Sequence, residues 1–387
     1  MRTLGRSNCY YFDLPRMKRF LKGYGVDYHA LKYIHVTGSK GKGSTCLMIA
    51  NYLKKASYKV GLFTSPCIID ERESFWLNGV FMSEKKFGFY VEDLKRYIDS
   101  ASGVSLPYFE LLVVMALKYF LDEKVDYAVM EVGLGGRLDA TNIINSKLAI
   151  LTSVEKEHTE FLGNTISKIL DEKLGVVKGK DDVPLLVGMQ KQEVKTLIKR
   201  KMKGYKKVYF VDEIKCPKFN FKPENEVQAD NAKVAYSALK LLLGNVNLGK
   251  FEKSLHEFRM IGRFQIEKIG GKTVVFDIAH TENSVKNLVK SLKKSLIAGP
   301  KKEFVFLISI MKGKDVKGIL RWVSSVAKRV VFTFSHSKRS MTGKELLASS
   351  KGFFKDASAN DDAISVYRKL LRGLKKDQVL VVTGSHF

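Results

Sequence analysis

The sequence predicts an α/β protein of two domains, each built on a mainly parallel sheet. Three observations lead to this prediction. The chain has 387 residues, more than one ordinary core holds. Short apolar runs rich in β-branched residues alternate with helical patterns. A glycine-rich segment stands between one such run and the helix that follows it. We expect a larger domain over residues 1–258 and a smaller one over residues 259–387.

The elements of the larger domain follow from hydrophobic periodicity. We expect strands at residues 33–37, 59–64, 127–132 and 148–152, and helices at residues 46–56, 108–123 and 228–243. Between about residues 188 and 223 the sequence is rich in lysine, and we expect less regular structure there. Strands that alternate with helices in this way predict a parallel sheet covered on both faces.

The same alternation begins again near residue 260. The expected strands are 273–277, 303–308, 329–334 and 378–382, and the expected helices are 284–296, 317–327 and 361–374. This pattern predicts the second, smaller α/β domain.

Composition excludes several classes of protein. Hydrophobic residues make up 45% and charged residues 28%, as in an ordinary globular protein. No apolar run is long enough to cross a membrane, and the first residues lack the apolar core of a signal peptide. We therefore expect a cytoplasmic protein. The four cysteines are scattered, which argues against a zinc site and a disulfide framework: Cys9, Cys46, Cys67 and Cys216.

The formal net charge of +27 is large, but the lysines are spread along the chain in short pairs. Three interpretations stay open. The charge can belong to a nucleic-acid-binding protein, to a solvated lysine-rich surface, or to a positive field that speeds the capture of anionic substrates.

Residues 37–45, Thr-Gly-Ser-Lys-Gly-Lys-Gly-Ser-Thr, are typical of a phosphate-binding loop. Its glycines allow backbone N–H groups to turn toward phosphate oxygens, and the next helix adds its positive N-terminal end. Lys42 can reach the β- and γ-phosphates, and Ser44 or Thr45 can lie near Mg²⁺. An extra glycine, Gly43, separates Lys42 from Ser44. The loop predicts ATP use, but by itself it fits a kinase, an ATPase, a GTPase or a ligase.

Five further residues are candidates for the site. Glu131 ends an apolar strand, where an open α/β sheet binds ligands, and can be a Mg²⁺ ligand or a surface carboxylate. His158 follows another strand, although a lone histidine is more often structural. Taken alone, Lys173 is an ordinary helix lysine. Asp277 ends the first strand of the second domain, and His280 follows three residues later.

Taken together and in order, these segments resemble the folylpolyglutamate synthase and dihydrofolate synthase family of the Mur ligase superfamily. The resemblance runs from about Leu14 to the C-terminus, and the extra glycine after Lys42 is itself a feature of the family. The segments that carry it are residues 35–45, 61–66, 131–142, 152–159, 172–175 and 276–280.

The resemblance implies a Mur-ligase-like ATPase domain with a phosphate loop and a parallel sheet over residues 1–258. It implies a Rossmann-like ligase domain over residues 259–387. The implied enzyme is an ATP-dependent ligase that adds L-glutamate to a folate-type carboxylate through an acyl phosphate, and we expect it to be bifunctional. Three alternatives stay open: a ligase for cell-wall precursors, a basic nucleic-acid-binding ATPase, and a catalytically weak relative that binds nucleotide only.

The resemblance also implies roles for individual residues. Lys42, Glu131, His158 and Lys173 match catalytic residues. The matches to metal ligands are Ser65, Glu131, His158 and Lys173, the last as a carbamate. The matches to ATP contacts are Gly38, Lys40, Gly41, Lys42, Gly43, Ser44, Thr45, Asn231, Arg263, Asp277 and His280, of which the last four are expected to act across a cleft between domains that close on ATP. The matches to substrate-lining residues are Pro107, Tyr108, Phe109, Glu110, Leu138, Asp139 and Ala140.

The implied cofactors are ATP, Mg²⁺, a CO₂-derived carbamate on Lys173 and a monovalent cation. The implied substrates are folate or dihydropteroate, L-glutamate and ATP. We expect a monomer that binds neither nucleic acid nor membrane.

The sequence departs from the family pattern at four places. Cys67 stands where the family has histidine, and Ser74 where it has arginine, with Arg72 close enough to substitute. Lys40 stands where asparagine is common, and Thr281-Glu282 replaces Asn-Pro.

Overall fold

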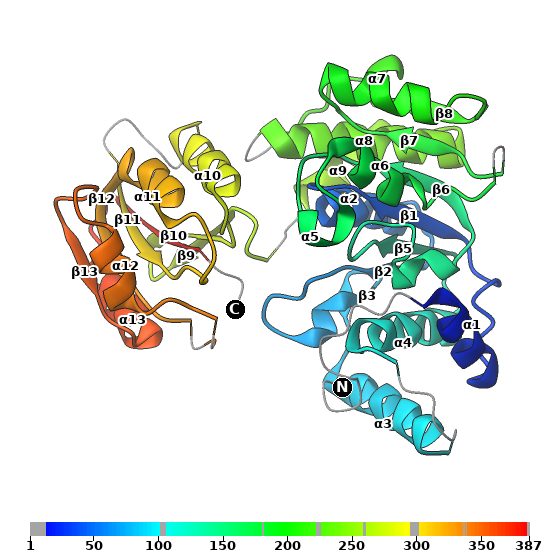
Figure 1. Cartoon of the computed structure of the whole chain (residues 1–387), viewed down its shortest axis with the longest axis horizontal. Helices are drawn as coiled ribbons and strands as arrows, with labels where there is room; N and C mark the ends of the chain where they lie inside the picture. Colours follow the sequence, from blue (N-terminus) through cyan, green and yellow to red (C-terminus); the bar gives the residue numbers. More distant parts are fainter. Residues whose placement is uncertain are drawn as a thin grey trace. The chain divides into compact units, whose positions relative to one another are not determined.

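The chain folds as two units, Met1–Phe258 and Arg259–Phe387. The computed structural model describes residues 13–100, 106–179, 182–221, 226–257, 261–294, 302–335, 337 and 339–384. Each unit is an α/β domain with its own sheet (Figure 1).

The first unit holds an eight-stranded sheet in the order β4-β3-β2-β5-β1-β6-β7-β8. The central strand β1 pairs in parallel with β5 and β6. Only β3 and β4, at one edge, run antiparallel to their neighbours. The strands are β1 (Tyr33–Thr37), β2 (Val60–Phe63), β3 (Phe75–Leu77), β4 (Val80–Phe81), β5 (Tyr127–Glu131), β6 (Ser146–Leu151), β7 (Leu185–Val187) and β8 (Val208–Phe210).

Helices cover this sheet and bury its apolar side chains. One core cluster joins α1, α3 and α4 to β2 and β5, and another joins α6 and α7 to β6 and β7. The helices are α1 (Leu14–Gly23), α2 (Lys42–Lys55), α3 (Glu84–Ser100), α4 (Tyr108–Asp122), α5 (Thr159–Leu162), α6 (Ile166–Leu174), α7 (Gln192–Lys201), α8 (Glu226–Leu243) and α9 (Leu248–His256), with 3₁₀ turns η1 (Glu71–Ser74), η2 (Ala140–Ile143) and η3 (Val211–Glu213).

The second unit holds a six-stranded sheet in the order β13-β12-β11-β14-β10-β9, parallel except for the edge strand β9. One core cluster lies under α10, α11 and α12, and a second under α13 on the other face. The elements are β9 (Gln265–Ile269), β10 (Lys272–Asp277), α10 (Glu282–Lys294), β11 (Glu303–Ile308), α11 (Val316–Ser324), β12 (Ala327–Phe332), α12 (Gly343–Ser349), β13 (Ala357–Ala359), α13 (Ala363–Gly373) and β14 (Gln378–Thr383).

The predicted fold class is confirmed, with local corrections. The lysine-rich stretch expected to be less regular contains α7 and β8. Helix α7 forms there because Val194 and Ile198 are buried on one side of it. The helix expected at residues 317–327 ends at Ser324, and Ala327 already belongs to β12. The last two residues of the helix expected at 284–296 lie outside the described residues.

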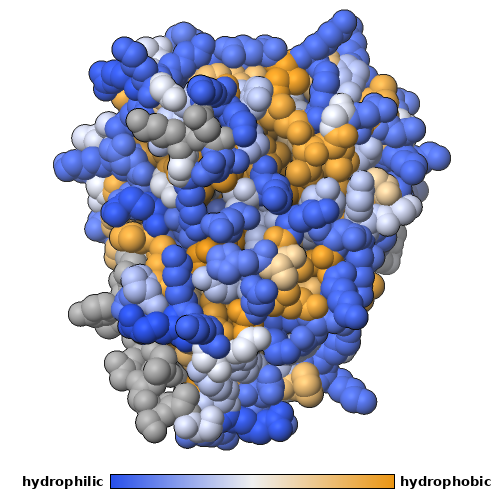
Figure 2. Space-filling model, turned by 90° about the vertical axis from the view of Figure 1, so that its right-hand side faces the viewer, coloured by the Kyte–Doolittle hydropathy of each residue, from blue (hydrophilic) through white to orange (hydrophobic). Residues whose placement is uncertain are grey.

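No helix in the described part of the chain is long and apolar enough to cross a bilayer. On the face drawn in Figure 2, apolar residues show in separate areas divided by hydrophilic side chains. Scattered apolar areas of this kind are normal on a protein surface.

Gly61 in β2 allows α4 to pack closely on the sheet. A Cβ atom at Gly61 would lie 2.5 Å from the ring of the buried Phe120. We expect Gly61→Ala to lower the free energy of unfolding by about 1–3 kcal/mol, because the ring must move within a packed core. The measurement is urea denaturation followed by circular dichroism.

Gly88→Ala is the matched control. Gly88 lies inside α3, and a Cβ there would meet nothing within 4 Å. We expect this change to stabilise the protein by about 0.5–1 kcal/mol, since alanine is the better helix former. A Gly61→Ala protein as stable as the wild type would contradict the close packing.

Candidate active site

Residues 38–41 connect β1 to α2 as a tight loop that only glycine allows at two positions. Gly41 has φ = +83° and caps α2, and a Cβ there would lie 2.3 Å from Asn231 Oδ1. A Cβ on Gly38 would lie 1.9 Å from Thr152 Oγ1. The first turn of α2 therefore opens directly from this loop, as in helix N-termini that bind phosphate.

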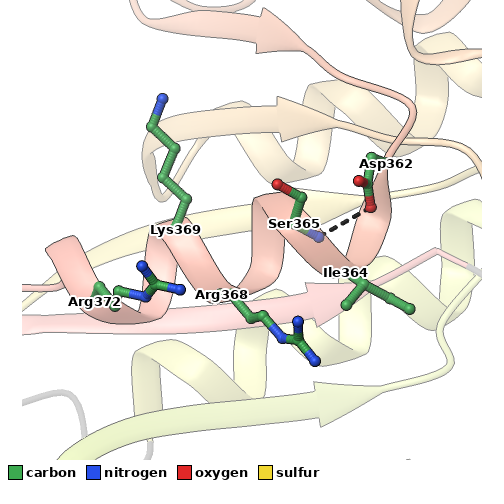
Figure 3. A pocket seen from close by; sticks show the side chains of 6 residues that line it. All are labelled: Asp362, Ile364, Ser365, Arg368, Lys369 and Arg372. Atoms are coloured by element: carbon green, nitrogen blue, oxygen red, sulfur yellow. Dashed lines mark hydrogen bonds between the residues drawn. The ribbon is translucent and has the colours of Figure 1, made fainter.

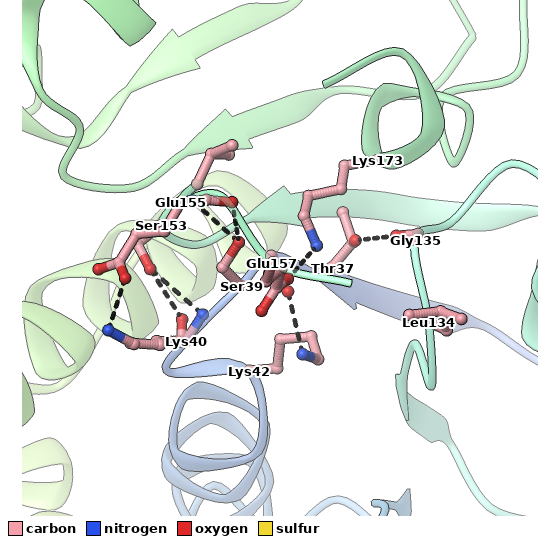
Figure 4. A network of polar contacts seen from close by, with 12 residues as sticks. Thr37, Ser39, Lys40, Lys42, Leu134, Gly135, Ser153, Glu155, Glu157 and Lys173 are labelled. Carbon is pink, nitrogen blue, oxygen red and sulfur yellow. Dashed lines mark hydrogen bonds and ion pairs between the residues drawn. The ribbon is translucent and has the colours of Figure 1, made fainter. Parts of the chain in front are cut away.

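Two lysines of the loop lie in different places (Figure 4). Lys42 begins α2, and its Nζ donates to the carbonyl oxygen of Gly38 at 2.9 Å, so its ammonium group lies over the loop. Lys40 instead pairs with Glu155 at 2.6 Å in a half-exposed contact. The geometry therefore favours Lys42 as the lysine that contacts phosphate.

The segment that follows β6 holds the loop in place. Ser39 N donates to the carbonyl oxygen of Ser153 at 2.7 Å, and Thr152 Oγ1 donates to that of Lys40 at 2.7 Å. Glu155 N donates to Ser39 Oγ at 3.0 Å. The conformation of the phosphate loop is thus held by hydrogen bonds to residues 152–155 as well as by its glycines.

Asn231 lies in α8 of the first unit, beside the loop. Its Nδ2 donates to Gln228 Oε1 at 3.1 Å, and Gln228 Nε2 donates to Ser44 Oγ at 3.3 Å. Both amide side chains are buried. Sequence reasoning missed Gln228, although its spacing of three residues from Asn231 places both on one helix face.

Glu131 ends β5 next to the phosphate-loop strand, with Val36 as its register partner. Its side chain is 5% exposed, and Oε2 accepts a hydrogen bond from Ser65 N at 3.2 Å. The structure thus brings together two of the four predicted metal ligands. Nearby in α2, the buried Thr45 Oγ1 has no hydrogen-bond partner among the described residues.

Lys173 and Glu157, the neighbour of His158 in the sequence, lie close to the phosphate loop. His158 adopts the left-handed conformation, with φ = +44° and ψ = +45°, just before α5. Such backbone strain in a residue other than glycine is concentrated at functional sites. The adjacent Glu157, which sequence reasoning missed, accepts a hydrogen bond from Lys173 Nζ at 2.9 Å (Figure 4).

Lys173 is 1% exposed, and this burial lowers the pKa of its amine to about 8, although Glu157 favours the charged form. Burial opposes ionisation of Glu157 as well, yet attraction to Lys173 and Lys42 lowers its pKa. A substantial fraction of Lys173 is therefore neutral just above neutral pH, which is the form that reacts with CO₂.

Residues 132–142, which follow β5, form a loop held by internal hydrogen bonds. We call it the glycine-rich loop. Asp139 is 2% exposed; its Oδ2 accepts from Leu134 N at 2.9 Å, and its Oδ1 accepts from Thr141 N at 3.0 Å. Burial raises the pKa of Asp139 and lowers that of the nearby His35 to about 3. The Asp139 carboxylate thus supports the loop itself.

The same loop packs on the end of α6 that carries Lys173. Arg137 N donates to the carbonyl oxygen of Glu172 at 2.7 Å, and Asn142 Nδ2 donates to that of Gly175 at 3.0 Å. A Cβ on Gly136 would lie 2.9 Å from the Glu172 carbonyl oxygen. This contact explains why the loop needs glycine here.

The expected substrate residues 107–110 begin α4 beside this loop. A Cβ on Gly133 would lie 2.5 Å from the Phe109 ring, so the two segments touch. Glu110 is buried and accepts from Arg16 Nη2 at 2.9 and 3.2 Å. Burial raises the pKa of Glu110 to about 7, although Arg16 opposes this shift. Arg16, on α1, is a third residue that sequence reasoning missed, after Gln228 and Glu157.

The loop after β2 contains the departures from the family pattern. Ser74 is 1% exposed. The guanidinium of Arg72 donates to both carboxylate oxygens of Asp70 at 2.8 Å, while Glu73 accepts from Ile68 N and Asp70 N. Arg72 is thus held by its own loop, and its expected substitution for the family arginine stays a prediction.

In the second unit, the three predicted residues gather at the carboxyl end of β10. Asp277 Oδ1 accepts from Ala279 N and Oδ2 from Phe264 N, each at 2.8 Å. Burial raises the pKa of Asp277 to about 6, whereas the adjacent charge of Arg263 opposes the shift. His280 Nδ1 lies 2.8 Å from the carbonyl oxygen of Ile278.

A hollow of about 600 Å³ lies elsewhere in the second unit, along α13 (Figure 3). It contains none of the predicted site residues. Its lining comes from α13 and the N-cap residue of that helix: Asp362, Ile364, Ser365, Arg368, Lys369 and Arg372. We therefore place the candidate site at the phosphate loop.

Comparison with known proteins identifies the family of the chain. A family model described as "Mur ligase middle domain" matches residues 94–269, and one described as "Mur ligase, glutamate ligase domain" matches residues 262–386. The dihydrofolate synthase/folylpolyglutamate synthase of Escherichia coli is 30% identical over 368 residues, covering 90% of this chain and 83% of that protein. The chain belongs to the dihydrofolate synthase/folylpolyglutamate synthase family.

Solved structures of this family share the fold. The crystal structure of a folylpolyglutamate synthase from Thermotoga maritima is 28% identical with a TM-score of 0.82, covering 96% of this chain and 90% of that chain. Escherichia coli FolC, solved in complex with DHPP and ADP, is 24% identical with a TM-score of 0.84, covering 98% of this chain and 92% of that chain.

The buried His35 leads to a prediction on stability. Its folded pKa is about 3 against an ordinary value of 6.5, so on acidification the unfolded state gains a proton before the folded state does. Its contribution to stability is present above about pH 6.5 and is lost as the pH falls toward 3. Between about pH 7 and pH 5, the wild type should lose about 2 kcal/mol more unfolding free energy than His35→Gln, which does not titrate.

Urea denaturation of both proteins across this pH range measures the difference. Parallel pH profiles would contradict a neutral, buried imidazole at position 35.

Proposed function

We propose that this chain is an ATP-dependent ligase that joins L-glutamate to a folate-type carboxylate through an acyl phosphate. One observation carries the proposal: the phosphate loop, the Glu131–Ser65 contact and the Glu157–Lys173 pair lie at the carboxyl ends of the adjacent strands β5, β1 and β6. Membership in a family whose Escherichia coli member is a dihydrofolate synthase/folylpolyglutamate synthase supports the same activity.

The acceptor carboxylate attacks the γ-phosphorus of ATP, a carboxyl O–P bond forms, and the P–O bond to ADP breaks. The amine of L-glutamate then attacks the acyl carbon and expels phosphate. Lys42 stabilises the negative charge that spreads over the transferring phosphoryl group, since its ammonium lies over the loop. The N–H groups at the start of α2 hold the phosphates in place.

The residues present fit Mg²⁺. The donors are the buried Glu131 carboxylate beside Ser65 and the hydroxyl of Thr45, for which the described part of the chain offers no hydrogen-bond partner. No group of three His, Cys, Asp or Glu side chains within the described ranges is arranged to hold a metal, but Mg²⁺ needs few protein ligands when phosphates supply the rest. Bound Mg²⁺ would reduce the repulsion between the two anionic reactants. A carbamate on Lys173 would add further oxygen ligands.

Dihydropteroate and tetrahydrofolate are both candidate acceptors, and we propose that the enzyme uses both. We place the acceptor against the glycine-rich loop and residues 107–110, because these segments touch each other beside the phosphate loop. The cytoplasmic location, the monomeric state, the monovalent cation and the absence of nucleic-acid binding stay predictions. So do contacts of Arg263, Asp277 and His280 with ATP.

A phosphate-release assay tests the activity. Purified protein is given ATP, Mg²⁺, L-glutamate and either dihydropteroate or tetrahydrofolate. We expect phosphate release that requires both glutamate and a pteridine acceptor, because the acyl phosphate needs both reactants to turn over. Phosphate release at the same rate with and without glutamate, or no phosphate release with either acceptor, would reject the proposal.

Substitution of Lys173 tests the carbamate. We expect Lys173→Ala to lower kcat by ~10²–10³-fold and small carboxylic acids to restore part of it, since they replace the missing anion. Lys178→Ala is the matched control, because Lys178 also has its pKa lowered to about 8 by burial but donates to the Ile144 carbonyl oxygen. It should keep activity. Lys173→Ala without rescue by any small carboxylate would remove the carbamate assignment.

A further inference from the structure

Strand β1 is tied to the glycine-rich loop by two fully buried side chains. Thr37 Oγ1 donates to the carbonyl oxygen of Gly135 at 2.6 Å, and His35 Nε2 lies 2.8 Å from Thr141 Oγ1. Thr37 and His35 are 0% and 1% exposed. The strand that leads into the phosphate loop therefore also contacts the loop that follows β5.

The His35 contact continues into the support of the glycine-rich loop. Thr141 Oγ1 donates to Asp139 Oδ1 at 2.5 Å, and Asp139 in turn accepts from Thr141 N and Leu134 N. A chain of hydrogen bonds thus runs from β1 through Thr141 and Asp139 to the backbone of residues 134–141.

The hydrogen-bond directions identify the tautomer of His35. Because the Thr141 hydroxyl donates to Asp139, its oxygen is left to accept, and His35 Nε2 must carry the hydrogen. The other nitrogen, Nδ1, is buried without a hydrogen-bond partner among the described residues.

An imidazole is a costly choice at this position. All five positions of β1 are buried, so an apolar side chain would satisfy the strand without leaving a polar atom unpaired. What the imidazole adds is the hydrogen bond to Thr141. A buried polar side chain at a position where an apolar one would be more stable is expected mainly where function requires it.

We propose that His35 is a positioning residue that holds the glycine-rich loop, and with it the acceptor, in register with the phosphate loop. The inference rests on the proposed function, in which the acceptor carboxylate must meet the γ-phosphate in line. An error of about 1 Å in such an arrangement can cost ~10²-fold in rate. His35 touches neither reactant; it acts through Thr141 and Asp139.

Two amide variants separate positioning from packing. Glutamine places its amide N–H near the position of Nε2, whereas the shorter asparagine places its amide near Nδ1. We expect His35→Asn to lower kcat/KM for the acceptor by ~10–100-fold while the KM for ATP and the Kd for ADP stay within about two-fold. His35→Gln should recover most of the loss.

Tyr33→Phe is the control for a buried polar change in the same strand. The Tyr33 hydroxyl donates to the Tyr28 carbonyl oxygen at 2.7 Å, away from the glycine-rich loop. This variant should have lower thermal stability with an unchanged kcat/KM for the acceptor. An equal loss in His35→Gln and His35→Asn, or an unchanged kcat/KM in His35→Asn, would overturn the proposal.

Hydrogen–deuterium exchange keeps this test separate from the proposed activity. The N–H groups of Leu134 and Thr141 donate to Asp139, so they should exchange faster in His35→Asn than in the wild type and in His35→Gln. If the wild type shows no ligase turnover, the proposed function fails, and exchange still decides the role of His35. Equal protection in all three proteins would overturn it.

Discussion

The parallel pairing of β1 with β5 on one side and β6 on the other is the constraint on which the site depends. In this register Val36 stands opposite Glu131, and Thr37 stands opposite Leu151. The three strands therefore end at one level of the sheet edge, where ligands of α/β proteins bind. The phosphate loop, the Glu131 carboxylate and the segment leading to His158 are brought together by the backbone pairing of these three strands.

Local signals made much of this arrangement predictable. The bounds of β1 follow from a short apolar run, the phosphate loop from its glycines, and the place of Glu131 from its position at a strand end. The side-chain contacts between segments far apart in the chain could not be predicted from any local pattern in the sequence. Glu157 reaches Lys173 and Arg16 reaches Glu110 across 16 and 94 residues. Each looks like an ordinary surface charge in the sequence, so only the folded chain identifies its partner.

The pair of Lys173 and Glu157 shows how the fold alters ordinary chemistry. Removing a lysine from water disfavours its charge, and one carboxylate only partly offsets this cost. The Arg137 and Asn142 contacts hold the end of α6, so the amine cannot escape to solvent. The same hydrogen bonds that shape the glycine-rich loop therefore also hold the helix end on which the buried Lys173 lies.

The sheet edges have a consequence for a chain of this size. The outermost strands are short: β4 has two residues, β8 and β13 have three each, and β9 has five. A short edge offers few free backbone donors and acceptors to a foreign strand, and the exposed Glu267 and Lys268 of β9 would place charges beside any strand that tried to add there. The edges of both sheets thus discourage cross-β aggregation, and the six-residue strands β6, β10, β11, β12 and β14 all lie inside a sheet.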